Sequence, residues 1–113
     1  MLFRSVVIID SISQYYRMFL GIAYARMGMP EKTKEQLDVF DKLEIESRSV
    51  SFGRAALLAE LGEVDSAIYW LQKSYEEKNQ LVFYIRPFKV LFSSIRSDQR
   101  FIEMYNKIFA NIE

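Results

Sequence analysis

The sequence predicts an all-α domain built from stacked antiparallel helix pairs. Helix breakers are rare, because the 113 residues include only four Gly and two Pro. Apolar residues recur at helical spacing in several stretches, which favours helices that each bury one face. Two Ala-x-x-Gly turns, ending at Gly28 and Gly62, lie 34 residues apart, and a period of this length is typical of repeated helix pairs.

The first predicted repeat covers residues 14–47. A helix is expected from Ile12 to Met27; it is apolar on almost all sides and should therefore pack against several neighbours. Gly28 can adopt the left-handed backbone that ends a helix, and Pro30 suits the first turn of the next one. That second helix, from about Glu31 to Ile45, is amphipathic. Its inward stripe consists of Thr33, Leu37, Phe40 and Glu44.

The second predicted repeat covers residues 48–81 and has the same plan. The stretch from Ser49 to Leu61 is broadly apolar, and Gly62 ends it. In the helix that follows, apolar residues recur at i, i+3, i+4 and i+7. The inward residues of this helix are Val64, Ala67, Ile68, Leu71 and Tyr75.

Residues 82–113 are predicted to form a degenerate capping pair, since terminal repeats usually depart from the repeat pattern. Continuing the period places a turn at residues 93–97, with Ser97 as the N-cap of a last helix from about Asp98 to Asn111. Pro87 should shorten or kink the helix before that turn. The residues expected to face inward on the last helix are Phe101, Ile102, Tyr105, Ile108 and Phe109.

The N-terminal residues 1–10 are interpreted as the remnant of a preceding helix. Residues 1–113 as a whole are expected to form a single domain. The apolar run from Val6 to Ile9 is far shorter than the ~20 residues that a membrane span needs. The features of a signal peptide are also missing, because the start has a single Arg and no cleavage site of small residues. We therefore expect a cytoplasmic location and no membrane partner.

The composition argues against an enzyme. The 15 Lys and Arg balance 15 Asp and Glu, which removes the positive charge expected of a nucleic-acid-binding protein. The absence of His and Cys removes the usual proton shuttle, thiol chemistry, disulfides and most metal sites. We therefore expect no catalytic residue, no metal and no cofactor.

Residues 96–101 allow two interpretations. Arg96 and Arg100 could form a small electropositive recognition patch. The structural interpretation is favoured, in which Ser97 caps the last helix, Phe101 anchors it, and both Arg pair with acidic side chains or helix ends.

Two short motifs resemble the tetratricopeptide repeat family. Leu20-Gly21-Ile22-Ala23-Tyr24 matches the Leu-Gly-x2-Tyr of its first helix, and Ala67-Ile68-Tyr69-Trp70-Leu71 partly matches the Ala-x3-aromatic of its second. Residues 59–78 and 95–101 resemble the C-terminal tetratricopeptide segment of bacterial transcriptional regulators, adenylate cyclases and protein kinases. The resemblance implies an α-solenoid, a right-handed superhelix of about two repeats plus the capping pair.

The same resemblance implies which residues face the inside of the superhelix. They are Tyr15, Met18, Ile22, Arg26, Phe52, Ala56 and Glu60, here called the inner strip. An apolar strip that contains Met suits an adaptable surface for a protein or peptide; alternatively, the chain itself covers the strip. Met18 and Ile22 stand where some family members carry the Lys and Asn of a carboxylate clamp, so the expected partner is apolar in part.

These observations predict a non-catalytic protein–protein or protein–peptide interaction module. The resemblance implies a regulatory or scaffolding domain of a bacterial signalling or transcription protein. The alternative is a self-association domain, in which residues 1–10 or a face of the last helix is buried in a homodimer.

Overall fold

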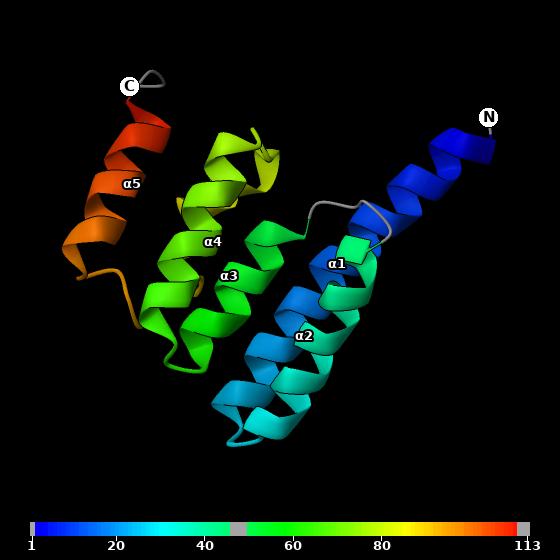
Figure 1. The fold of residues 1–113 in the computed structure, drawn as a ribbon, viewed down its shortest axis with the longest axis horizontal. Coiled ribbons are helices and arrows are strands. Elements are labelled where there is room, and N and C mark those ends of the chain that lie inside the picture. The colour runs from blue at the N-terminus through cyan, green and yellow to red at the C-terminus, as the bar shows by residue number, and fades with distance from the viewer. Residues whose placement is uncertain (1, 46–49, 111–113) are drawn as a thin grey trace.

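The computed structural model describes residues 2–45 and 50–110, with side chains at 14–43, 50–79 and 81–110. This described part is all-helical and contains five α-helices and one 3-10 helix. They are α1 (Leu2–Arg26), α2 (Pro30–Ile45), α3 (Ser51–Glu60), α4 (Val64–Glu76), η1 (Gln80–Ile85) and α5 (Gln99–Phe109). Figure 1 shows the hairpin of α1 and α2, then α3, α4 and α5, side by side in one row.

Each of the two helix hairpins, α1–α2 and α3–α4, is closed by a glycine. Gly28 has a φ of 76° and Gly62 a φ of 81°, both in the left-handed region. The amide after each glycine donates to the carbonyl five residues back, at 2.8 Å in the first hairpin and 2.9 Å in the second. This is the Schellman arrangement, and it confirms the two helix ends that the sequence predicts.

The first hairpin and α3 approach each other closely because two of their helical positions lack a side chain. A Cβ atom at Gly21 would lie 2.5 Å from a methyl group of Leu57, and one at Gly53 would lie 2.9 Å from the ring of Phe40. Thr33 is fully buried here, and its hydroxyl donates to the carbonyl of Gly21 at 2.7 Å. The hydroxyl therefore sits in the core with its hydrogen bond made, and the predicted inward position of Thr33 is confirmed.

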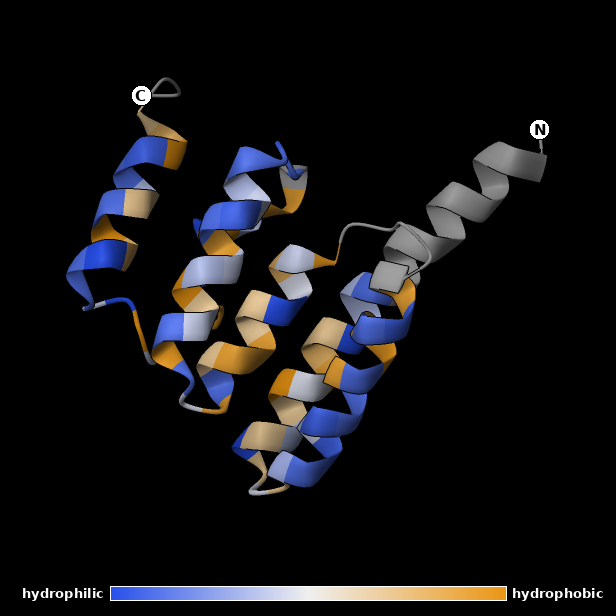
Figure 2. Cartoon of the chain, in the orientation of Figure 1, coloured by the Kyte–Doolittle hydropathy of each residue, from blue (hydrophilic) through white to orange (hydrophobic). Residues whose placement is uncertain are grey.

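Helix α3 is the central helix of the fold. It contacts α1, α2 and α4, and seven of its ten residues are buried. Figure 2 shows α3 mainly in hydrophobic colours and α2 mainly in hydrophilic ones, as expected for an inner and an outer helix. None of the described helices combines the length and apolar character needed to cross a membrane.

Helix α1 is longer than the sequence predicts. The expected start was Ile12, with a separate helix remnant at residues 1–10, but α1 runs unbroken from Leu2. The remnant interpretation is therefore wrong for the described residues 2–10, because no Gly or Pro interrupts the chain before Gly21. Since α1 has 25 residues and α2 has 16, the N-terminal part of α1 extends past the end of α2 (Figure 1).

The first helix of the predicted capping pair does not form as an α-helix. Helix α4 ends in a third Schellman turn, with Lys78 left-handed at a φ of 59°, and η1 follows. Pro87 has no amide hydrogen, so it cannot donate the bond that would continue an α-helix. From Phe88 to Asp98 the backbone forms tight turns, closed by amide-to-carbonyl bonds between residues three apart, at 3.0 to 3.4 Å. Residues 82–113 therefore contain one described α-helix, α5, instead of a pair.

Helix α5 begins one residue later than predicted, and its N-cap is Asp98 instead of Ser97. The Asp98 carboxylate accepts a hydrogen bond from the amide of Arg100 at 2.8 Å. The Arg100 guanidinium pairs with Asp98 and with Asp65 in the first turn of α4, which ties the starts of the two helices together. Hydrogen bonds from Arg100 hold the pKa of the Asp98 carboxyl below its ordinary value.

The buried face of α5 differs from the predicted one at Ile102 and Met104, and Tyr105 is only partly buried. Its buried residues are Phe101, Met104, Ile108 and Phe109. Ile102, which was expected to face inward, is 38% exposed, and Met104 occupies the core instead. Residues 101, 104 and 108 follow the helical i, i+3, i+7 spacing, which leaves Ile102 on the outer side.

Arg96 holds the turns between η1 and α5 in place. Its guanidinium donates to the carbonyls of Ile85 at 2.7 Å, Leu91 at 3.0 Å and Phe88 at 3.2 Å, and it lies 5.5 Å from the ring centre of Phe101. Burial lowers the pKa of the guanidinium, but an Arg side chain keeps its charge in proteins. One cation thus donates to three carbonyls of the stretch between η1 and α5.

We expect Arg96→Ala to destabilise the fold by about 2–3 kcal/mol, because the turns lose a charged donor while their carbonyls stay partly buried. The stability of Arg96→Lys should fall between those of Arg96→Ala and the wild type, since an ammonium cannot reproduce the planar fork of donors. Urea unfolding followed by circular dichroism measures both. Lys89→Ala, at an exposed position in the same stretch, is the control. Equal stability of Arg96→Ala and the wild type would contradict this role.

Candidate functional site

The inner strip is not an open surface. Its residues come from α1 and α3 as expected: Tyr15, Met18, Ile22 and Arg26, then Phe52, Ala56 and Glu60. Met18, Ile22, Phe52 and Ala56 are each exposed by 3% or less. The expectation of an apolar groove open to a partner is therefore wrong for these four residues, which belong to the core.

The strip is covered by residues 80–98, here called the covering segment. The ring of Phe92 lies 5.5 Å from that of Phe52, and the hydroxyl of Ser94 donates to the carbonyl of Ala59 at 2.9 Å. The buried residues of the segment are Val82, Ile85, Leu91, Phe92 and Ile95. Because these side chains are part of the same core, the segment completes the fold, and the alternative that the chain covers its own strip describes this arrangement.

The two charged residues of the inner strip bind each other and the covering segment. Arg26 pairs with Glu60 at 2.8 Å, across 34 positions of the sequence. The same guanidinium group donates to the hydroxyl of Ser93 at 2.6 Å and to the carbonyl of Val90 at 3.1 Å. Arg26 and Glu60 therefore hold the covering segment, which occupies the place where a groove would bind a partner.

Tyr15 takes part in a different feature, a closed ring of four aromatic side chains. Neighbouring ring centres around this aromatic quartet are 4.9 Å apart for Tyr15 and Phe19, and 5.8 Å for Phe19 and Phe88. They are 5.6 Å apart for Phe88 and Tyr84, and 5.2 Å for Tyr84 and Tyr15. Tyr84 is 38% exposed and Phe88 is 39% exposed. Burial, together with the neighbouring Tyr84, raises the pKa of Tyr15 above its ordinary value.

Sequence reasoning found only one member of this quartet as a site residue. Tyr84 and Phe88 were missed because the sequence predicts a shortened or kinked helix of the capping pair here, and not η1 followed by turns. The available signal was Pro87, which stands between the two aromatic residues and prevents an α-helix from continuing through them. The structure brings both rings onto α1 through this break.

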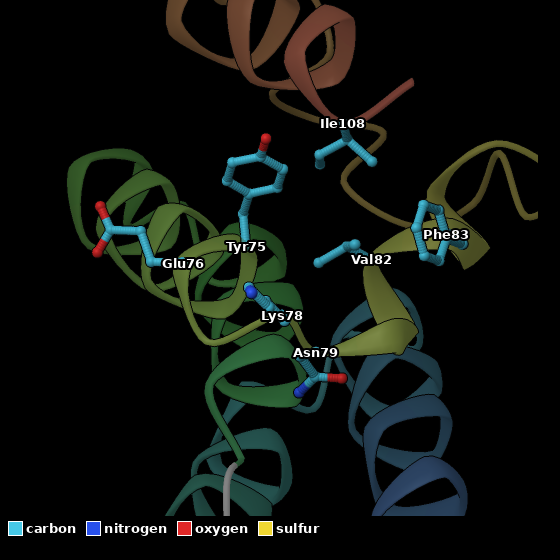
Figure 3. Close-up of a pocket in the computed structure, with 7 residues that line it drawn as sticks. All are labelled: Tyr75, Glu76, Lys78, Asn79, Val82, Phe83 and Ile108. Atoms are coloured by element: carbon cyan, nitrogen blue, oxygen red, sulfur yellow. The ribbon is translucent and has the colours of Figure 1, made fainter. Parts of the chain in front are cut away.

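A half-open cavity of about 460 Å³ lies between the end of α4, η1 and α5 (Figure 3). Its lining residues are Tyr75, Glu76, Lys78, Asn79, Val82, Phe83 and Ile108. Figure 3 shows Tyr75, Val82 and Ile108 around a common space, whereas the carboxylate of Glu76 points away from it. The Asn79 side chain accepts a hydrogen bond from the amide of Leu81 at 2.9 Å and so caps η1 at the cavity's edge.

Two further observations add no functional residue to the quartet or to the cavity. Among the residues that the structure describes, no three or more Asp and Glu side chains gather in a group that could hold a metal ion. Comparisons of the chain with protein-family models, with curated proteins and with solved structures find no match. The resemblance to tetratricopeptide repeats therefore stays a prediction from the sequence pattern.

We expect Met18→Glu to destabilise the protein by roughly 3 kcal/mol or more, because it would bury a carboxylate without a partner. Tyr16→Glu, on the same helix but at a side chain that is 65% exposed, should change stability by no more than about 0.5 kcal/mol. Urea unfolding measures the stability of both variants and so distinguishes a core position from a surface position. Wild-type stability of Met18→Glu would mean that the strip is accessible after all.

Proposed function

We propose that this chain is a non-catalytic protein-interaction module whose helix pairs are arranged as in a tetratricopeptide solenoid. Two observations support the repeat. The hairpins close with the same hydrogen-bond pattern at Gly28 and Gly62, and Arg26 and Glu60, at equivalent repeat positions, contact each other directly. As in the proteins that the sequence resembles, we propose a regulatory or scaffolding role in a bacterial signalling or transcription protein in the cytoplasm.

The observation that carries the interaction function is the exposure of the aromatic quartet. Two of its rings leave more than a third of their surface to solvent, although four aromatic side chains in mutual contact could have been buried together. Aromatic residues are enriched at protein interfaces, where a few of them supply most of the binding energy. The quartet, and not the filled inner strip, is therefore the proposed binding surface.

The chemistry of the quartet indicates the kind of partner. Its rings meet at angles of 48° to 69°, so their edges and faces both reach the surface and suit an inserted apolar or aromatic side chain. Lys89, which follows Phe88 directly, is exposed. A peptide segment with an apolar residue next to an acidic one matches this surface.

The test is a selection of peptides from a displayed random library against the whole domain. We expect enriched peptides to bind Tyr84→Ser about tenfold more weakly than the wild type, because the partner loses a central aromatic contact. Tyr69→Ser removes a tyrosine that is 58% exposed on α4 and should leave the affinity unchanged. Isothermal titration measures both, and circular dichroism checks the fold. Equal affinities for the two variants, or no enriched peptide, would refute this surface.

A second candidate function is self-association through the N-terminal part of α1. This part extends past the end of α2, as Figure 1 shows, and its sequence includes the apolar run from Val6 to Ile9. A helix with such a sequence needs a neighbour to bury apolar side chains, and a second copy of the chain would supply one. The side chains of this run lie outside the described ones.

We expect the wild type to form a dimer by light scattering on a sizing column, and Val7→Glu to give a monomer near 13.4 kDa, since an added carboxylate opposes burial in the interface. Arg4→Glu, which changes a residue that is already charged, is the matched control. A wild type that stays monomeric across the concentration series would exclude this candidate.

A further inference from the structure

The cavity between α4, η1 and α5 has the size and walls of a small-ligand site. Its volume of about 460 Å³ lies within the range of roughly 300–1,000 Å³ typical of such pockets. Val82 and Ile108 are buried at its back, and the ring of Tyr75 stands across from them (Figure 3). Phe83 forms a further wall and leaves 46% of its surface exposed. The site is apolar except at its edge.

Lys78 supplies a cation at that edge. Among the described residues it has no ion-pair partner, although its side chain lines the cavity. Its backbone adopts the left-handed conformation, with a φ of 59°, in a turn where the other two hairpins carry Gly. Lys is disfavoured in this conformation, and strained backbone positions often coincide with functional ones. The turn alone gives no reason for Lys at this position.

The remaining charges leave the edge of the cavity positive. The carboxylate of Glu76 accepts a hydrogen bond from Gln72 along α4 at 3.4 Å and points away from the cavity (Figure 3). The ammonium of Lys107 lies 5.9 Å from the ring centre of Tyr75 and adds a second cation nearby. Two carbonyls at the end of α4 are already bonded by the amides of Lys78 and Asn79, at 3.0 and 3.1 Å, which weakens the negative pole of the helix.

We propose that this cavity binds a small amphipathic anion, a carboxylate with a short alkyl chain. Lys78 would bind the carboxylate, and the alkyl chain would lie between Tyr75, Val82 and Ile108. This site is distinct from the aromatic quartet, because Phe83 and Tyr84 of η1 face opposite sides: Phe83 lies 6.1 Å from Phe109 of α5, and Tyr84 contacts Tyr15 of α1. The proposal therefore does not depend on the proposed interaction function.

Three probes with the same alkyl chain and different headgroups test the charge of the site: octanoate, octanol and octylammonium. Nitrogen–proton correlation spectra of the full chain report both affinity and location. We expect octanoate to bind most tightly and octylammonium least tightly, with shifts at residues 75–83 and at Ile108. Tighter binding of octylammonium than of octanoate, or no binding of any probe, would overturn the proposal.

Lys78→Asn is the decisive variant, because Asn tolerates the left-handed backbone and removes the ammonium group. We expect this variant to bind octanoate about fivefold more weakly than the wild type and to bind octanol with unchanged affinity. Lys89→Asn, at an exposed residue that does not line the cavity, should change the affinity for neither probe. Phe83→Glu provides an independent check, since a carboxylate on the cavity wall should weaken octanoate and strengthen octylammonium. Unchanged octanoate affinity in both Lys78→Asn and Phe83→Glu would refute the site.

Discussion

The packing of residues 80–98 against α1 and α3 determines which surfaces this protein offers. Without this segment, Phe52, Met18 and Ile22 would line an exposed apolar face between the two helix hairpins. With it, Leu91, Phe92 and Ile95 extend the core across that face, and every one of them is almost completely buried. The segment contains no α-helix, so its backbone depends on side chains for many of its hydrogen bonds. Arg96 from within and Arg26 from α1 supply them.

The strongest local signals in the sequence predicted the two hairpins correctly. Gly28 and Gly62 end their helices as expected, because left-handed backbone is easily accessible only to glycine. The inward residues Thr33 and Phe40 of α2, and Leu71 of α4, are buried, since a 3.6-residue period puts apolar side chains on one face whatever they pack against. These features depend on residues within one or two helical turns of each other, which a sequence displays directly.

The covering segment could not be predicted in the same way, because its conformation depends on contacts far along the chain. Phe92 packs on Phe52, and Arg26 reaches Val90, across 64 positions. Extending the 34-residue period predicts a helix at this place, shortened or kinked by Pro87, whereas the chain forms η1 and then tight turns. The error then passed to the candidate site. The inner strip would be open in two isolated repeats. In this structure the turns of the covering segment pack on it and bury it.

The same segment also explains why two candidate sites arise next to each other. Helix η1 is a single short element, and its neighbouring residues Phe83 and Tyr84 face the cavity beside α5 and the quartet beside α1. A displacement of η1 that widened the cavity would move Tyr84 relative to Tyr15, because a turn of 3-10 helix moves as a unit. Val82 and Ile85, buried in the same turn, oppose such a displacement, since a shift of either would open a void in the core. The exposed rings on both sides are thus held by a buried pair between them, which keeps both surfaces preformed and limits the ordering that binding of the proposed ligands would require.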